Sequence, residues 1–520
     1  MADYDAIIVG AGHNGLAAAA VLAKEGLKVL VLEKQRYVGG MAGTTEYFKG
    51  FKHNVGAWAL MVSTRSINKA LELEEHGFEV IDPPISFCTF GEPGDTPYIY
   101  YNDPARLEKH LREDHGDDAA QALEGLYGIS RTFGMAIGAL RFKLPKSLGA
   151  VIDGMPSLKD RDVMRRCLFG SAVDLISEFF PDRTKHKSIQ ASLAAMAVDG
   201  TGVGPYSAGT AFSLGLHLAP MAFGVHFQLV KGGMGGFSEA IRQSIEEKGG
   251  EVKLLTPVKR VMVENGKAIG VELKSGEKIS ARVVLSNLDA YSTFFRLVGD
   301  HNLPADFTGM VRRIKYTNPY LEIHVTLKEL PEFVGDLAFA NESNIRWSMS
   351  YIPSLDNLEQ CYDACKWGRV PKVPYSAYYI PSLLDDSFAP PGYHSATFFS
   401  QFFPINAPRE QHKQLKEEMA DRVIDQMNRF APNLKDAIVD KVVFTPLHYE
   451  KMFGITGGDY SHGLMQPDQL LDSRPVMGWS EYKTPVENLY LCGSACHPGP
   501  GVTAVPGYNS AREVLKTWEK

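Results

Sequence analysis

The sequence predicts an α/β fold: a discontinuous Rossmann-type nucleotide-binding domain that carries an inserted, mixed α+β substrate domain. A strand–helix–strand pattern begins at residue 5 and encloses a glycine-rich sequence. A second glycine-rich sequence precedes a helix and several short strands in the middle of the chain, and a strand–loop–helix pattern ends it. The chain has 520 residues, which exceeds one ordinary domain, so we expect two hydrophobic cores.

The first unit of this fold is expected in residues 5–33. Residues 5–9 predict an apolar strand, residues 14–25 an alanine-rich helix, and residues 28–33 a second apolar strand. This order is that of a β-α-β unit, in which the two strands lie parallel in one sheet.

The middle of the chain predicts a second ordered block. A helix is expected at residues 237–248, followed by short apolar strands between residues 251 and 286, with Asn265-Gly266 and Ser275-Gly276 at two of the turns. Such pairs between alternating apolar runs favour tight hairpins, so a β-meander is expected.

The end of the chain predicts a return to the first domain. Residues 488–493 read as a strand, and residues 509–518 as a helix behind a loop rich in glycine and proline. The nucleotide-binding domain is therefore assigned to residues 1–60, 225–300 and 455–520, and the substrate domain to residues 61–224 and 301–454.

The first glycine-rich sequence is a dinucleotide-binding fingerprint, made of Gly10, Ala11, Gly12, His13, Asn14 and Gly15. It follows a strand and opens a helix, and Glu33 ends the next strand, which is the context that the fingerprint requires. Its glycines allow a tight turn and let backbone N–H groups approach a pyrophosphate at the helix N-terminus. The Glu33 carboxylate is expected to accept hydrogen bonds from the adenosine ribose and to disfavour a 2′-phosphate.

Two further features favour FAD over NAD as the dinucleotide. A second glycine pair follows the second strand closely, and the C-terminal loop offers a strand, a turn and backbone N–H groups for a flavin ring and ribityl chain. A second fingerprint with its own β-α-β unit is not found in the sequence. The additional residues expected to contact FAD are Lys34, Gly39, Gly40, Gly493, Ser494, Gly501 and Val502.

Three segments resemble the phytoene desaturase family, which includes carotene desaturases, carotenoid isomerases and retinol saturases. They read GAGHNGLAAAAVLAKEGLKVLVLEKQRYVGG, KGGMGGFSEAI and LYLCGSACHPGPGVTAVPGYNSA. Residues 378–404 and 457–475 are similar to the branch named for pyridine nucleotide-disulfide oxidoreductase domain-containing protein 2. The resemblance covers nearly the whole chain and implies a two-domain GR2-like flavoprotein.

The resemblance implies further FAD contacts. The backbone of Val258 corresponds to the residue that meets the adenine, and Met41 and Ala42 correspond to residues on the flavin side. One departure is Pro500, which stands where the family commonly has glycine. It is expected to stiffen the loop without removing the site.

The candidate catalytic residues are His462, His497, Tyr508 and His53. A flavin dehydrogenase takes a hydride from a substrate C–H at N5, and histidine is the natural base at neutral pH. The alternative for each histidine is a structural hydrogen bond, because a histidine beside a cofactor loop more often has that role. A carotene desaturase needs little help from a base, so a catalytic role stays open for all four.

The function expected is FAD-dependent dehydrogenation of a lipophilic, terpenoid or alicyclic small molecule. The electrons would pass to oxygen, a quinone or a carrier protein. Three alternatives remain: a double-bond isomerase that uses reduced FAD, a flavin amine oxidase, and a flavin-binding partner protein without activity.

Composition limits the other classes. The formal net charge is −7 and a basic run is lacking, which argues against nucleic-acid binding. Six cysteines without zinc-like spacing predict neither a disulfide framework nor a metal site. The N-terminal sequence lacks a signal-peptide pattern, and a cytoplasmic protein is expected.

Two segments bear on whether the protein contacts an apolar substrate or a membrane surface. Residues 200–230 contain no Asp, Glu, Lys or Arg, which predicts either the wall of an apolar substrate tunnel or plain core packing. Residues 133–152 mix basic and apolar side chains and predict a cap helix with a solvated basic side, or else a peripheral contact with a membrane surface.

Overall fold

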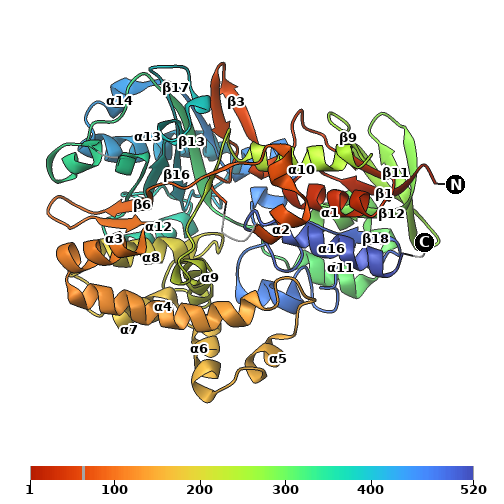
Figure 1. Cartoon of the computed structure of the whole chain (residues 1–520), viewed down its shortest axis with the longest axis horizontal. Helices are drawn as coiled ribbons and strands as arrows, with labels where there is room; N and C mark the ends of the chain where they lie inside the picture. Colours follow the sequence, from red (N-terminus) through yellow and green to blue (C-terminus); the bar gives the residue numbers. More distant parts are fainter. Residues whose placement is uncertain (1, 61–64, 343, 519–520) are drawn as a thin grey trace.

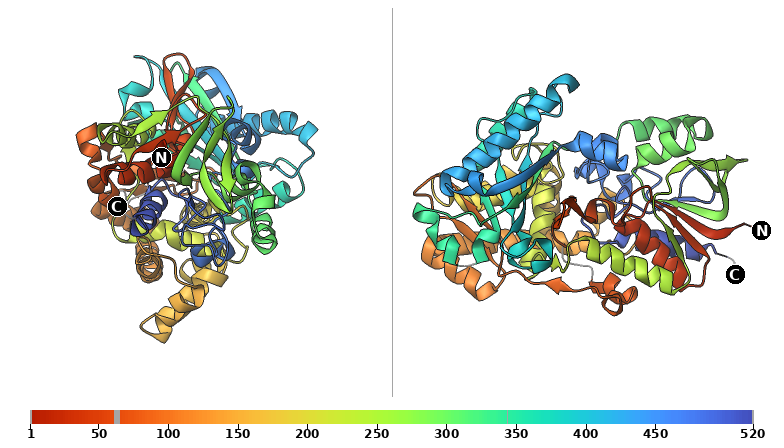
Figure 2. Two further views of the ribbon diagram at one scale, coloured as in Figure 1. Left: turned by 90° about the vertical axis from the view of Figure 1, so that its right-hand side faces the viewer. Right: turned by 90° about the horizontal axis from the view of Figure 1, so that it is seen from above.

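The computed structural model describes residues 2–60, 65–342 and 344–518 and has two parts lying side by side, each built around its own sheet (Figure 1). The first and last described segments lie together at the same end of the molecule, beside the first sheet (Figures 1 and 2). This arrangement confirms the predicted α/β fold with two cores.

The first sheet is parallel at its centre. Its parallel strands are β1 (Tyr4–Val9), β2 (Val29–Leu32), β9 (Glu251–Lys253), β12 (Lys278–Ser286) and β18 (Leu489–Leu491). β1 lies between β2 and β12, and β18 from the end of the chain pairs with β12. The last four residues of β1 and all of β2 carry buried apolar side chains because helices and loops cover the sheet on both faces.

The predicted meander was wrong in one strand. β10 (Val258–Glu264), β11 (Lys267–Leu273) and β12 form an antiparallel meander, but β9 pairs parallel with β2 at the opposite edge. An apolar strand has the same pattern with a parallel or an antiparallel neighbour. The helix before it, α10 (Gly235–Glu247), returns the chain to the edge beside β2.

The two ends of the chain meet through a pair of helices. α1 (His13–Lys24) is buried along most of its length and packs against α16 (Val505–Lys516). α16 begins earlier than the predicted helix because Pro506 suits the first turn of a helix, where its missing N–H costs nothing. A Cβ added to Gly507 would lie 1.8 Å from the backbone oxygen of Asn14, so the two helices touch at that point.

The second sheet is mixed and has the order β17-β13-β16-β15-β14-β6-β7. Its strands are β6 (Ile85–Phe90), β7 (Tyr98–Tyr101), β13 (Tyr320–Leu327), β14 (Ser348–Tyr351), β15 (Ser376–Tyr379), β16 (His394–Gln401) and β17 (Ile438–Phe444). Two short antiparallel ribbons lie outside these sheets. One pairs β3 (Thr44–Phe48) with β4 (Phe51–Asn54), and the other pairs β5 (Val80–Ile81) with β8 (Leu229–Val230).

Helices of the second part pack on this sheet and extend below it (Figure 1). They are α3 (Pro104–His110), α4 (Asp117–Gly138), α5 (Leu148–Asp153), α6 (Leu158–Phe169), α7 (Ala172–Phe179), α8 (Lys187–Val198), α9 (Thr210–Ala222), α12 (Leu355–Lys366), α13 (His412–Phe430), α14 (Leu434–Ala437) and α15 (Pro446–Phe453). α9 packs against α4, α6 and α8, so most of residues 200–230 is core.

The packing at two predicted domain limits differs from the sequence assignment. Residues 61–64 lie outside the described residues. Just after them, α2 (Arg65–Ala70) and residues as far as Phe78 pack in the core of the first sheet, as does α11 (Ala305–Arg312). Both helices are short and amphipathic, so the sequence has no change of composition at residue 60 or 300 to mark where the packing changes.

Residues 133–152 cover the end of α4, a turn and the start of α5. Arg141 and Phe142 in the turn contact α16: the Arg141 carbonyl accepts a hydrogen bond from Asn509, and the Phe142 ring meets Tyr508 edge-on. Within the described ranges, we find no helix with both the length and the apolar character needed to cross a bilayer.

The contact between α1 and α16 yields a stability prediction. We expect Gly507→Ala to lower the free energy of unfolding by about 1–3 kcal/mol, because the new methyl group must push α16 away from the Asn14 carbonyl. Gly128→Ala is the matched control, since that helical glycine has no atom within 4 Å of the added Cβ. The control is expected to keep or slightly raise stability. Equal urea unfolding curves for both variants would contradict the close contact.

Candidate active site

The fingerprint loop has the geometry that the sequence predicts. Gly10 adopts a φ of 96° and its N–H donates to the Leu32 carbonyl, which turns the chain sharply after β1. A Cβ on Gly15 would lie 2.3 Å from the Gly10 backbone oxygen, so a larger residue would force the helix away from the turn. Gly39 donates to the Ala11 carbonyl at 2.8 Å, which places the second glycine pair directly against the first loop.

Glu33 lies buried at the end of β2, with 8% of its surface exposed. Its carboxylate accepts hydrogen bonds from the backbone N–H groups of Ala11 and Gln35, both at 2.8 Å. The backbone carbonyl of Glu33 accepts from Thr256 at 2.7 Å, which brings the segment leading into Val258 beside it. This edge of the sheet therefore gathers the residues predicted for the adenosine half of FAD.

The other predicted cofactor residues lie around this loop. Met41 accepts a backbone hydrogen bond from Ala57 at 2.9 Å, and Ala42 donates one to Gly39. Lys34 points toward the end of α15, and burial lowers the pKa of its ammonium group. These contacts extend the predicted cofactor surface from the sheet edge toward the second part of the molecule.

The C-terminal loop closes onto the fingerprint loop. The Asn14 side-chain amide donates to the Ser494 hydroxyl at 3.1 Å, although the two residues are 480 positions apart. Farther along, Gly501 and Val502 have φ of 125° and 47°, so this loop reverses direction at backbone angles that favour glycine.

Asn287 fills the space between the two loops and was missed in the sequence analysis. Its side-chain nitrogen lies 2.5 Å from where a Cβ on Gly12 would be, and its backbone oxygen lies 2.5 Å from where one on Gly493 would be. Asn287 directly follows β12, at the carboxyl edge of the sheet. Ligands of such folds bind outside that edge, and this position could have identified it.

The residues present fit FAD. His13 Nε2 and Asn14 Oδ1 in the fingerprint loop are buried and have no hydrogen-bond partner within the described residues. Buried polar atoms are almost always paired in proteins, so these two are suited to a polar ligand at the helix N-terminus. In the described part of the chain, no group of three or more His, Cys, Asp or Glu is placed to hold a metal ion.

Arg474 connects the C-terminal loop to a loop that contains His462, and no pattern in the sequence indicated this residue. Its guanidinium is 2% exposed and donates to the carbonyls of Ser461, Gly463, Gln469 and Ser494. Burial lowers the pKa of Arg474 to about 10, and the nearby Asp459 opposes this shift. Burial raises the pKa of Asp459 to about 7, although the hydrogen bonds that Asp459 accepts from two backbone N–H groups lower it.

His462 is the predicted catalytic histidine that the structure brings to the fingerprint loop. Its backbone lies in the left-handed region, with φ of 56°, and its ring lines a small cavity together with Arg474 and Ala495. Burial lowers the pKa of His462. Burial lowers the pKa of His13 to about 3, and the charge of the His462 ring adds to this shift.

His497 and Tyr508 lie elsewhere on the C-terminal segment. The His497 ring bonds the Leu140 carbonyl at 3.0 Å, and its own carbonyl accepts from Tyr482. Tyr508 packs on Phe142. These contacts join the C-terminal segment to the end of α4, and a catalytic role for either residue stays a prediction.

His53 belongs to a separate buried polar cluster between β4 and the second sheet. Its ring bonds the Val325 carbonyl at 3.1 Å and lies 5.3 Å from the His324 ring. Beside them, the Tyr449 hydroxyl donates to the Val55 carbonyl at 2.8 Å and is also hydrogen-bonded to the Glu322 carboxyl. Burial raises the pKa of Glu322 to about 8, so this carboxyl holds a proton at neutral pH.

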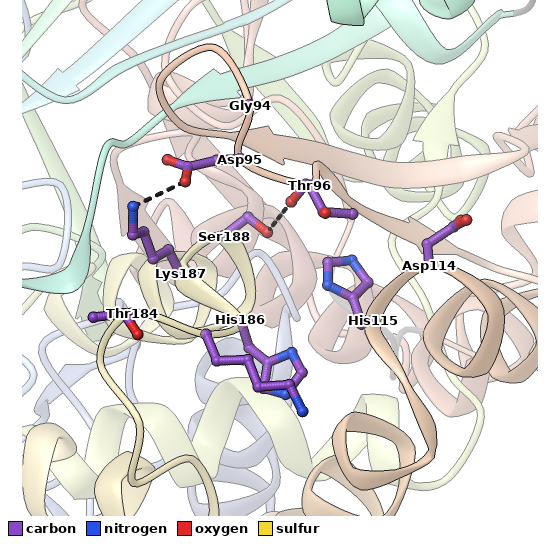
Figure 3. Close-up of a pocket in the computed structure, with 10 residues that line it drawn as sticks. Gly94, Asp95, Thr96, Asp114, His115, Thr184, His186, Lys187 and Ser188 are labelled. Carbon is purple, nitrogen blue, oxygen red and sulfur yellow. Dashed lines mark hydrogen bonds and ion pairs between the residues drawn. The ribbon is translucent and has the colours of Figure 1, made fainter.

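A hollow of about 300 Å³ lies apart from these loops, between the β6–β7 turn and the start of α8 (Figure 3). Its charged groups already have partners: Lys187 pairs with Asp95 at 2.9 Å, and Lys185 pairs with Asp118. Ser188 donates to the Thr96 carbonyl. We therefore assign no ligand to this hollow.

Comparison with known proteins decides the family. Residues 15–514 match the family described as flavin containing amine oxidoreductase. The chain belongs to this family. FAD is its cofactor, and the protein is an FAD-dependent oxidoreductase.

The relatives agree with the resemblance seen in the sequence. The chain is 31% identical to pyridine nucleotide-disulfide oxidoreductase domain-containing protein 2 of Mus musculus, over 99% of this chain and 94% of the relative. It is 27% identical to the chloroplastic prolycopene isomerase of Daucus carota (97% and 78%). It is 24% identical to the lycopene-forming phytoene desaturase of Pseudescherichia vulneris (96% and 96%).

Among solved structures, an oxidoreductase from Methanosarcina mazei has a TM-score of 0.63 at 16% identity, covering 99% of this chain and 100% of the other. At that identity, the likeness shows a common fold. The predicted fold class is confirmed by this neighbour as well as by the two sheets.

The fingerprint geometry yields a cofactor prediction. We expect Gly15→Ala to weaken FAD binding about tenfold or more, because the added methyl would lie 2.3 Å from the Gly10 carbonyl and distort the turn. The ratio of visible flavin absorbance to protein absorbance measures it, with Gly128→Ala as the control. A folded Gly15→Ala protein with full flavin content would contradict the assignment.

The buried Glu322 yields a pH prediction. Its folded pKa of about 8 lies above the usual value of 4.5, so the folded state binds a proton that the unfolded state releases. The stability from this proton is present below pH 4.5 and is lost as the pH rises through 8. Glu322→Gln removes the titration, and the wild type should lose up to about 1.4 kcal/mol per pH unit relative to it.

The measurement is urea unfolding of both proteins between pH 5 and pH 8. Glu329→Gln is the control and should follow the wild type, because Glu329 is exposed and lies two residues beyond β13, the strand that contains Glu322. Parallel pH curves for the wild type and Glu322→Gln would refute the raised pKa.

Proposed function

We propose that this enzyme desaturates a C–C bond of a lipophilic, terpenoid or alicyclic molecule. The observation that carries the proposal is the meeting of three loops. The fingerprint loop, the C-terminal loop and the His462 loop are held together by the Asn14–Ser494 hydrogen bond and by Arg474. The carotenoid-type names of two relatives support an apolar substrate.

When bound, FAD supplies a two-electron acceptor at flavin N5. In the proposed reaction the substrate loses a hydride from one carbon and a proton from its neighbour, and the pair of electrons left behind forms the C=C bond. The hydride would carry two electrons, which bound FAD would accept, and the final acceptor would be oxygen, a quinone or a carrier protein.

In this proposal the chain binds the dinucleotide, orients the substrate and shields the substrate from water. The fingerprint loop and Glu33 hold the dinucleotide, while the second sheet and its helices exclude water from the substrate. His462 is the proposed proton acceptor, because burial lowers its pKa and thereby favours the neutral ring that a base requires. His53, His497 and Tyr508 have the structural contacts described above and are weaker candidates.

A second candidate is double-bond isomerisation with reduced FAD. The specific observation in its favour is the 27% identity to a prolycopene isomerase across 97% of the chain. The two reactions differ in electron balance, because an isomerase consumes no electron acceptor. Amine oxidation is a further alternative, on the family description alone.

We also propose a cytoplasmic location with peripheral contact to a membrane. α5 and α6 project from the lower part of the molecule in Figure 1, and large apolar side chains are exposed on and near them. They are Met135, Phe142, Leu158 and Phe169. Co-sedimentation with vesicles of anionic phospholipid tests the contact.

The test of the function is anaerobic reduction of the bound flavin. The purified protein, loaded with FAD, is mixed with members of a panel of terpenes, carotenes, alicyclic ketones or acids, and amines. We expect a terpenoid or alicyclic compound to bleach the visible flavin band, and the product to carry one more double bond.

His462→Gln should then slow flavin reduction by roughly 10²–10⁴-fold, the range for a lost general base, while leaving flavin content unchanged. Bleaching by amines alone would favour the amine oxidase. Turnover of a cis polyene by reduced protein without an acceptor would favour the isomerase.

A further inference from the structure

A charged cluster interrupts the otherwise uncharged wall around residues 200–230. Asp199 follows α8, His217 lies on α9, and Tyr460 precedes Ser461 in the His462 loop. The Tyr460 hydroxyl donates to Asp199 Oδ1 at 2.5 Å, and His217 Nε2 lies 3.4 Å from Asp199 Oδ2. Three separate segments thus converge on one carboxylate.

The hydrogen bonds indicate that this cluster is an ion pair. His217 Nδ1 faces the Ser213 carbonyl at 2.9 Å, so that nitrogen donates. The other ring nitrogen, Nε2, lies 3.4 Å from Asp199 Oδ2, and a ring that directs both nitrogens at acceptors fits the protonated form. Burial lowers the pKa of His217, but the hydrogen bond and charge of Asp199 outweigh it, and the net shift is upward.

The pair is deep in the molecule yet not fully covered. Burial is the largest single influence on the pKa of both Asp199 and His217, as expected for groups surrounded by protein. However, 46% of the Asp199 side chain and 15% of the His217 side chain remain accessible. These accessible fractions leave part of the Asp199 carboxylate open to contact with a ligand.

The pair also lies beside the proposed reaction centre. The Gly200 N–H donates to the Tyr460 hydroxyl at 3.1 Å, and Met465 donates to the Gly200 carbonyl at 2.8 Å. These bonds attach the end of α8 to both sides of the loop that contains His462. A ligand that contacts Asp199 consequently lies next to Tyr460, which is two residues before the proposed base His462.

Plain packing does not account for such a group. Replacing a buried ion pair with apolar residues is often neutral or stabilising, so a pair in an apolar wall needs another role. The Tyr460 hydroxyl and, at 3.4 Å, the Gln401 amide donate to Asp199 Oδ1, whereas Asp199 Oδ2 faces His217 at 3.4 Å. Each carboxylate oxygen can accept about two hydrogen bonds, and 46% of the Asp199 side chain is accessible, so Oδ2 can accept one from a ligand.

We propose that Asp199, oriented by His217 and Tyr460, binds a hydrogen-bond donor, a hydroxyl or an ammonium group, at one end of the otherwise apolar substrate. This inference rests on the proposed function and names the substrate class more narrowly. A hydrocarbon would leave the carboxylate position unfilled, and a carboxylic acid would be repelled as its anion. A donor group would fix which C–H bond is presented to the flavin.

The test uses the FAD-loaded protein and four probes with one carbon skeleton: limonene, perillyl alcohol, perillylamine and perillic acid. Binding is followed through the change in the visible flavin spectrum, which needs no turnover. We expect the alcohol or the amine to bind about tenfold or more tightly than limonene and the acid, the range for a hydrogen bond to a charged group. Comparing the alcohol with the amine distinguishes the two donors.

Asp199→Asn should abolish that preference with little change in limonene binding, and Tyr460→Phe should reduce it. Asp82→Asn is the matched control, because Asp82 also accepts from a histidine and a glutamine, His226 and Gln228, but lies at the surface. It should behave as the wild type.

Equal affinities, a preference for the acid, an unchanged preference in Asp199→Asn, or no spectral change with any probe would overturn the site. The proposed function is judged separately. Flavin reduction by perillyl alcohol at the same rate in the wild type and Asp199→Asn would support dehydrogenation and overturn this site. Selective binding of the alcohol without flavin reduction by any compound would support this site and contradict dehydrogenation.

Discussion

A buried guanidinium must satisfy its N–H donors inside the protein, and Arg474 does so with backbone carbonyls alone. Ser461, Gly463 and Gln469 provide acceptors from one side, and Ser494 provides one from the C-terminal loop. Because carbonyl positions are fixed by the backbone, this network sets the conformation of the His462 loop relative to the C-terminal loop. The proposed catalytic and substrate contacts depend on that setting.

The same region joins the ends of the chain. Asn14 reaches Ser494, β18 pairs with β12, and α16 rests on α1 at the Gly507 contact. A discontinuous domain of this kind can form only when the last segment returns to the first. Cofactor binding and folding are therefore coupled, since the two loops that would surround FAD come from opposite ends of the sequence.

Polar groups in the second part are concentrated where it faces the first. The Glu322–Tyr449 pair with His53 lies behind the second glycine pair, and the Asp199–His217 pair lies beside the His462 loop. Burial raises the pKa of Glu322 beside the Tyr449 hydroxyl and the His324 ring, whose own pKa is lowered by burial. In contrast, the hydrogen bonds and the charge of His217 outweigh burial at Asp199, and the pKa of Asp199 is lowered.

The sequence by itself determined the β-α-β unit, the fingerprint loop, Glu33 and the return of the last strand and helix, because glycine geometry and apolar periodicity act locally. It also indicated FAD and the family. Only the tertiary structure decided that β9 is a parallel edge strand, that Asn287 and Arg474 hold the loops, and that His462 rather than His497 approaches the fingerprint. The physical reason is distance along the chain. Asp199, His217 and Tyr460 share no local sequence pattern, and only folding brings His217 and Tyr460 to the Asp199 carboxylate.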